Sequence, residues 1–80
     1  MSKLKDYPVN LMTRNFLLSV LNEDGLELQY IPKSIMTEET CLAAVKQNGL
    51  SLQYVPNELL TQETRLEAIK KTPKSIQYIT

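Results

Sequence analysis

Apolar residues return at intervals of three and four positions in two stretches of the chain. The first stretch contains Cys41, Leu42, Ala44 and Val45, and the second contains Leu66, Ala68 and Ile69. This spacing places the apolar side chains along one stripe of an α-helix. Each stretch is therefore predicted to be a helix whose apolar stripe faces a core.

Both predicted helices have recognisable start and stop signals. Thr37 and Thr61 precede them, and a threonine oxygen can accept a hydrogen bond from a free amide of the first turn. Lysines stand near the ends, after which the chain reaches Asn48-Gly49 in one case and Pro73 in the other. Such residues commonly follow the last turn of a helix.

The segments before Pro32 and Pro56 allow two interpretations. Leu26, Leu28 and Tyr30 alternate as in a strand, whereas the spacing of Leu50, Leu52, Tyr54 and Val55 also fits a helix. We predict a short helix of about two turns, because a strand in each copy would need partners for its edges. The residues from each proline to the next threonine then form an extended connector.

The pattern repeats when the chain is shifted over itself so that residue 25 falls on residue 49. Most positions of 25–32 are then identical to those of 49–56, and the match continues through the predicted helices. A single domain is predicted, with a divergent copy at 1–24, copies at 25–48 and 49–72, and a half copy at 73–80. The expected fold is all-α, a compact stack of about three 24-residue helix-loop-helix repeats.

The run from Cys41 to Pro56 resembles the bacterial short helical repeat family known as "domain of unknown function 4116". The resemblance covers roughly residues 25–80, whereas residues 1–24 depart from it, for instance at Arg14 and Phe16. It implies short helical repeats in bacterial or phage-associated proteins. It implies no activity and transfers no catalytic residues.

Composition narrows the class of protein. The chain has 80 residues, of which 42% are hydrophobic and 22% charged, as in one small globular domain. Nine basic residues balance nine acidic ones, so no nucleic acid partner is expected. The apolar runs are short and Cys41 is the lone cysteine, so we expect no membrane contact and a cytoplasmic, reducing location.

The chain is predicted not to be an enzyme and to need no cofactor or metal. It lacks histidine, so a Cys-His or Ser-His nucleophile and a His/Cys metal site cannot be assembled. The remaining enzymatic alternative uses Cys41, expected in a partly buried site, or a carboxylate pair such as Glu38-Glu39. Carboxylates at a helix start more often match the positive end of its dipole. Gly25 and Gly49 are isolated and are interpreted as helix stops.

Gln-Tyr pairs recur at 29–30, 53–54 and 77–78 and are the best polar candidates for recognition. Stacking would place them in a ladder, which either supports the scaffold, with glutamine bonding between repeats, or binds a partner. Two acidic residues of the second copy join them. The candidate partner-binding residues are Gln29, Gln53, Gln77, Tyr30, Tyr54, Glu38 and Glu39.

Charge is uneven along the chain, with an acidic stretch at residues 23–40 and lysines near the C-terminus. These regions could steer a partner or a second copy of the chain, and the half copy leaves an apolar end that invites a homodimer. The predicted function is a non-enzymatic protein–protein interaction module with an unknown protein partner. The alternative is a small bacterial or phage inhibitor or immunity protein that binds a toxin or defence enzyme.

Overall fold

The computed structural model describes residues 3–73, and every regular element in this range is helical. The α-helices are α1 (Arg14–Glu23), α2 (Glu38–Gln47) and α3 (Gln62–Lys71). The 3-10 helices are η1 (Val9–Leu11), η2 (Gly25–Tyr30), η3 (Gly49–Tyr54) and η4 (Asn57–Leu59). The all-α prediction is confirmed for the described residues. None of the helices in this range is long and apolar enough to cross a bilayer.

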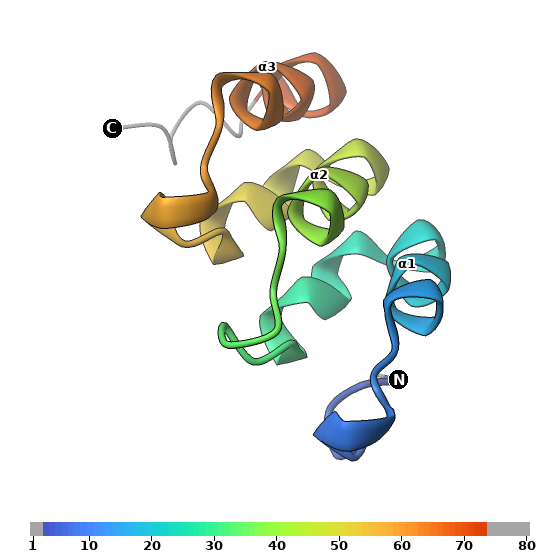
Figure 1. Ribbon diagram of the computed structural model, residues 1–80. Helices are drawn as coiled ribbons and strands as arrows, with labels where there is room; N and C mark the ends of the chain where they lie inside the picture. Colours follow the sequence, from blue (N-terminus) through green and yellow to red (C-terminus); the bar gives the residue numbers. More distant parts are fainter. Residues whose placement is uncertain (1–2, 74–80) are drawn as a thin grey trace.

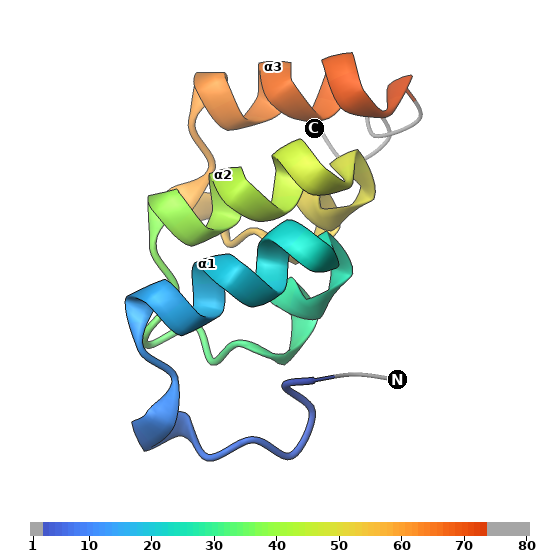
Figure 2. The same cartoon turned by 90° about the vertical axis from the view of Figure 1, so that its right-hand side faces the viewer.

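The helices form two adjoining rows (Figures 1 and 2). In the α row, α1, α2 and α3 lie side by side and run in the same direction, so their starts share one edge of the molecule. In the 3-10 row, η2 and η3 lie next to each other, and each contacts the α-helix before it and the α-helix after it. The α-helices begin at residues 14, 38 and 62, so their starts are equally spaced along the chain. The predicted compact stack of helices is thus observed.

Threonine caps set the start of every α-helix. The side chains of Thr13, Thr37 and Thr61 accept hydrogen bonds from the amides three residues later, in Phe16, Thr40 and Thr64, at 3.3, 3.2 and 3.1 Å. At α2 the Thr40 hydroxyl also accepts from the Thr37 amide at 3.0 Å, so the two threonines cap each other as in a capping box. The predicted starts after Thr37 and Thr61 are confirmed.

The core lies between the two rows. It includes Leu21, Leu28, Ala44 and Val45, all fully buried. The predicted apolar stripe is wrong at its margin, because Leu66 is 49% exposed and Leu42 is only half-buried. These two residues occupy equivalent positions of α3 and α2, and Leu42 lines a surface hollow together with Leu18 of α1.

The predicted short helices before Pro32 and Pro56 are confirmed as η2 and η3. Asp24 and Asn48 cap them, and their side chains accept from the Leu26 and Leu50 amides, each at 3.0 Å. Both caps use the same geometry, so the two short helices start in the same way.

Gly25 and Gly49 follow the ends of α1 and α2, as predicted, but each also begins the next 3-10 helix and neither has a positive φ. A Cβ at Gly49 would lie 2.6 Å from the carbonyl oxygen of Ala68, and one at Gly25 would collide with the Ala44 carbonyl. Close packing against the following α-helix, rather than backbone conformation, therefore requires glycine here.

Side chains at helix ends link successive units. Gln47 at the end of α2 accepts from the Gly25 amide at 2.7 Å and donates to the Glu23 carbonyl at 3.2 Å. Thr72, which follows α3, accepts from the Gly49 amide at 3.1 Å. These bonds satisfy backbone groups that a helix end leaves without partners.

The connectors after the prolines are not fully extended, contrary to the prediction. The carbonyl oxygens of Pro8, Pro32 and Pro56 accept from the amides of Leu11, Ile35 and Leu59 at 3.0, 3.1 and 2.9 Å. Each bond closes a turn between a proline and the third residue after it. The turn shortens the path from the 3-10 row back to the start of the next α-helix.

A buried carboxylate holds the N-terminal segment against the stack. Glu27 is 3% exposed, and its two oxygens accept from the backbone amides of Lys3 and Leu4 at 2.9 and 3.2 Å. The Leu4 side chain is 1% exposed and joins the core. Farther along, Tyr7 stacks on Phe16 with ring centroids 4.6 Å apart, so the segment is attached at two places.

Candidate partner-binding surfaces

A groove of about 260 Å³ runs over the 3-10 row between η2 and η3. Its lining combines apolar side chains with two amides and one ammonium group. The lining residues are Leu28, Gln29, Ile31, Lys33, Met36, Gln53, Tyr54, Val55 and Pro56. Three of the predicted partner-binding residues, Gln29, Gln53 and Tyr54, are thereby brought together in one groove.

The two glutamines of this groove make the same local bond. The Gln29 side-chain amide donates to the Leu26 carbonyl at 3.0 Å, and that of Gln53 donates to the Leu50 carbonyl at 3.1 Å. Each bond stays within one turn and both residues are exposed. Among residues 3–73, neither glutamine makes the bond between repeats that the scaffold interpretation requires. The glutamine that does link units is Gln47, which the sequence pattern did not single out.

The tyrosines of the predicted ladder do not behave alike. Tyr30 and Tyr54 are both half-buried and pack against the core, but only Tyr54 is among the residues that line the groove. Gln77, the third glutamine of the ladder, lies outside the described residues. The ladder is therefore seen as two glutamines and one tyrosine over a single groove.

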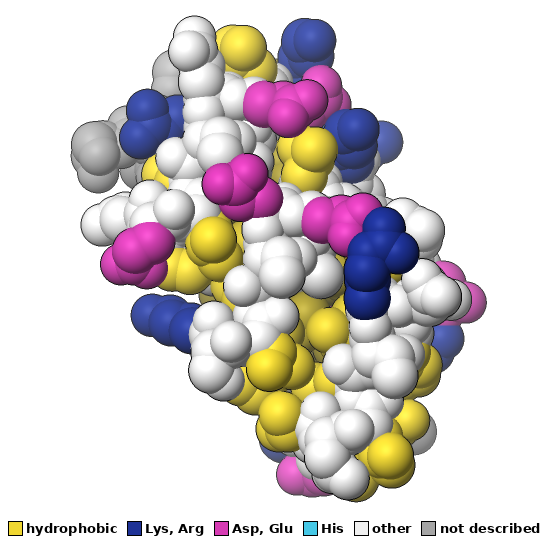
Figure 3. All heavy atoms as spheres, viewed as in Figure 1, with side chains coloured by type: hydrophobic (Ala, Val, Ile, Leu, Met, Phe, Trp, Pro, Cys, Tyr) yellow, Lys and Arg dark blue, Asp and Glu magenta, His cyan; other side chains and the backbone are white. Residues whose placement is uncertain are grey.

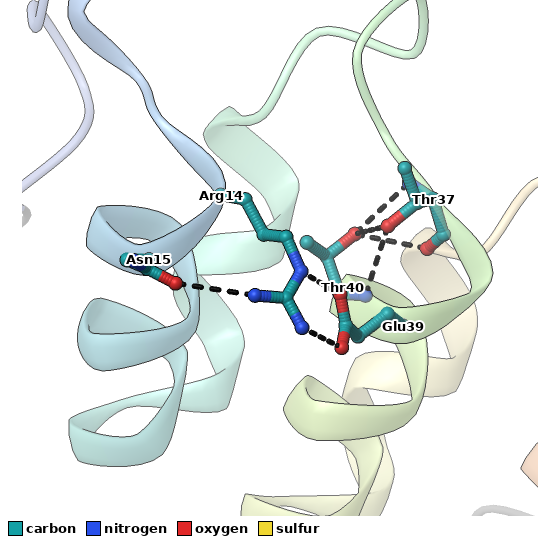
Figure 4. Close-up of polar contacts among 5 residues, drawn as sticks. All are labelled: Arg14, Asn15, Thr37, Glu39 and Thr40. Carbon is teal, nitrogen blue, oxygen red and sulfur yellow. Dashed lines mark hydrogen bonds and ion pairs between the residues drawn. The ribbon is translucent and has the colours of Figure 1, made fainter.

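The acidic candidates lie at the start of α2, away from this groove. Glu38 and Glu39 are both exposed residues of its first turn. Arg14 at the start of α1 holds Glu39 by two parallel bonds, from Nε to Oε1 and from Nη2 to Oε2, each 2.5 Å long (Figure 4). This bidentate geometry is the one that arginine favours with carboxylates.

The Arg14–Glu39 pair changes the titration of both groups. Hydrogen bonding from Arg14 lowers the pKa of Glu39, assisted by the attraction between the charges and opposed by desolvation. Hydrogen bonding to Glu39 likewise raises the pKa of Arg14. Both side chains are about half exposed or more, so solvent limits what the pair adds to stability.

An apolar pocket of about 220 Å³ lies beside this ion pair, between the starts of α1 and α2. Its lining places apolar side chains together with the paired charges and two threonines. The lining residues are Met12, Arg14, Leu17, Ile35, Thr37, Glu39 and Thr40. Sequence reasoning missed this pocket because its residues come from separate segments, and Arg14 was noted only as a departure from the later copies.

The structure corrects the expected setting of Cys41. Its side chain is fully buried rather than partly buried. Burial raises the pKa of the thiol from 9.0 to about 11, despite a hydrogen bond with Thr40 that lowers it. A thiol nucleophile needs access and an available thiolate, and this site supplies neither. Among residues 3–73, no group of three or more potential His, Cys, Asp or Glu ligands is placed to hold a metal.

Cys41 should react with a thiol reagent only when the fold opens. Because the buried side chain is protonated below about pH 11, we expect labelling by 5,5′-dithiobis(2-nitrobenzoate) at pH 8 to be at least a hundredfold slower in the native protein than in denaturant. A time course of absorbance measures both rates. The native rate should rise when urea is added below the unfolding midpoint. Fast labelling without denaturant would show that Cys41 is accessible, and it would support the alternative in which Cys41 is a reactive thiol.

These features define a class of protein, namely a small stack of alternating α- and 3-10 helices whose described residues form the groove and the pocket above. The family model described as Domain of unknown function (DUF4116) matches the chain twice, at residues 13–60 and 37–80. The chain belongs to this family. The two matches begin at residues 13 and 37, each directly before the start of an α-helix. No curated protein and no solved structure matches the chain.

Proposed function

We propose that the chain is a non-enzymatic protein-binding module whose contact surface is the groove between η2 and η3. The observation that carries the proposal is the pair of exposed glutamines, Gln29 and Gln53, that are held in the same way over one groove. Such regularly spaced side chains suit recognition of an extended segment. The proposal includes a cytoplasmic location and a protein partner, and it allows a homodimer, which sedimentation velocity would detect.

The chemistry of the groove suits a peptide segment. A glutamine side chain carries two N–H donors and a carbonyl acceptor, and only one donor is used in the bond to its own turn. The second N–H donor and the carbonyl acceptor can pair with the backbone of a bound peptide. Leu28, Ile31 and Val55 form the buried apolar floor of the groove. A partner would therefore contact mainly the exposed Gln29, Lys33 and Gln53 and the half-buried Tyr54.

Replacing Gln53 by alanine should weaken partner binding at least tenfold and leave the fold intact. The side chain is exposed and its hydrogen bond is local, so we expect a change of less than about 0.5 kcal/mol in the free energy of unfolding. A partner isolated by pull-down and identified by mass spectrometry provides the ligand, and calorimetry measures its affinity. Thermal unfolding of the same variant measures stability.

Gln47→Ala is the matched control for this experiment. Gln47 is also a glutamine, but it bonds the backbone of the preceding unit and does not line the groove. It should lower the melting temperature and retain affinity for the partner. If Gln53→Ala instead destabilised the protein as much as Gln47→Ala and bound the partner normally, Gln53 would be a scaffold residue and the proposal would fail.

A further inference from the structure

We propose a second docking surface at the edge where α1, α2 and α3 begin, which binds a protein segment that carries an apolar anchor residue next to lysine or arginine. This surface comprises the pocket between α1 and α2 and the acidic first turns beside it. It shares no lining residue with the groove between η2 and η3. The inference therefore goes beyond the proposed function and stands or falls separately.

The pocket has the size and lining to take one large apolar side chain. Its volume is about 220 Å³, less than the roughly 300–1,000 Å³ typical of small-molecule sites. Met12, Leu17 and Ile35 form its apolar lining, and all three pack in or against the core. A large side chain, often aromatic, that fills a pocket is a common anchor of a protein interface.

The Arg14–Glu39 pair at this pocket contributes no net charge. The two forked bonds of 2.5 Å match one guanidinium to one carboxylate (Figure 4). Glu39 is therefore already occupied, and Arg14 is not available to attract an acidic partner without breaking both bonds. The net charge at this edge is therefore determined by the other charged residues of the helix starts.

Among the remaining charges of these helix starts, the carboxylates of Glu38 and Glu63 outnumber the guanidinium of Arg65. The repeat register places Glu38 at the position of Arg14 and Glu63 at the position of Glu39, so the second helix pair carries two carboxylates where the first carries an ion pair. Both carboxylates are exposed in first turns. The first three residues of the three helices thus contain three carboxylates against one guanidinium, and the exposed Arg65, the fourth residue of α3, adds a second guanidinium.

The face that contains these helix starts shows the same division (Figure 3). Apolar side chains gather in its lower half, and acidic side chains lie above them, over the starts of α2 and α3, with lysine and arginine side chains among and beside them. Carboxylates that share one edge repel each other, and a cation placed near them relieves the repulsion. A segment with an apolar anchor and adjacent lysine or arginine is complementary to both halves.

Selection from a displayed library of random dodecapeptides tests the chemistry of the partner. We expect the recovered peptides to combine a large apolar residue with lysine or arginine within four positions. A synthetic peptide of the enriched sequence should shift the amide NMR signals of residues 12–17 and 35–40. Recovery of no peptide, or of peptides without basic residues, would overturn the proposal. Shifts confined to residues 28–33 and 53–56 would overturn it too, while supporting the groove.

Substitutions separate charge from pocket. E38K/E63K should weaken binding of the enriched peptide at least tenfold, and the weakening should shrink as salt concentration rises. The matched charge reversal E23K, at the opposite end of α1, should leave the affinity within twofold. Met12→Gln keeps the length of the side chain but makes it polar, and it should weaken binding at least fivefold. Unchanged affinity in the E38K/E63K variant, with an unchanged melting temperature, would exclude this surface.

Discussion

Replacing Gly49 by alanine should lower the melting temperature by about 15 °C. The added Cβ would lie 2.6 Å from both the Ala68 carbonyl oxygen and the Thr72 Cβ. Because these atoms lie in the last part of α3 and in the residue that caps it, the protein can accommodate the methyl group only by moving η3 away from α3. Overpacking of this kind costs about 3 kcal/mol, and a domain of this size loses roughly 4–8 °C per kcal/mol. Thermal unfolding followed by circular dichroism measures the shift.

A second substitution distinguishes a backbone collision from a side-chain collision. Thr72→Ala removes the Thr72 hydroxyl, which would lie 2.7 Å from the new Cβ, but the Ala68 carbonyl remains. The double variant G49A/T72A should therefore be no more stable than G49A. Lys46→Ala, at an exposed helical position, is the neutral control. A melting temperature of G49A within 3 °C of the native value would show that η3 and α3 do not pack as described.

Replacing Glu27 by alanine should release the N-terminal segment and lower the free energy of unfolding by about 3 kcal/mol. Hydrogen bonds to a charged group contribute about 1.5–3 kcal/mol each, and the Glu27 carboxylate accepts two of them, from the Lys3 and Leu4 amides. Relief from burying the carboxylate offsets part of this loss. Urea unfolding measures the free energy, and hydrogen exchange at the Leu4 amide reports the release.

Glu23→Gln is the control for this prediction. Glu23 pairs with the Lys3 ammonium group at the surface, where an ion pair contributes little, so the variant should unfold like the native protein. The free energy of unfolding of Glu27→Gln should fall between those of E27A and E23Q, since the glutamine keeps one acceptor oxygen. If E27A kept both its stability and the protection of the Leu4 amide, the carboxylate would not be what holds the segment.

The features that the sequence predicted correctly are those with local causes. Thr37 and Thr61 mark helix starts because a cap acts on amides only three residues away. The α-helices follow from an apolar period that stays within one helix. The short helices before Pro32 and Pro56 required a choice between helix and strand, and the argument about strand edges decided it correctly.

The features that it missed depend on residues distant in the chain. Glu27 resembles a surface residue, because nothing near it reveals that the Lys3 and Leu4 amides will meet its carboxylate. Gln47 was passed over for the more regular Gln29 and Gln53, yet it makes the bonds between units. Leu66 was placed in the core because periodicity identifies an apolar stripe but not which margin of it neighbouring helices cover.

The two candidate surfaces also differ in whether the sequence predicts them. Gln29, Gln53 and Tyr54 share a groove because a regular period places equivalent side chains side by side. The pocket between α1 and α2 needs Arg14 from the divergent first copy to meet Glu39 from the second. A comparison of copies emphasises what they have in common, so it overlooked a site that depends on their difference.

The contacts between elements have a consequence for how the domain unfolds. Within residues 3–73, α2 packs against both α1 and α3, whereas α1 and α3 share no substantial contact. The free energy of such a chain is close to a sum over single units and nearest-neighbour interfaces. Unfolding therefore begins most easily at an outer unit, which loses one interface, while the central unit must lose two. We expect insertion of a further 24-residue segment to add an interface of the existing kind without altering the packing of the other helices.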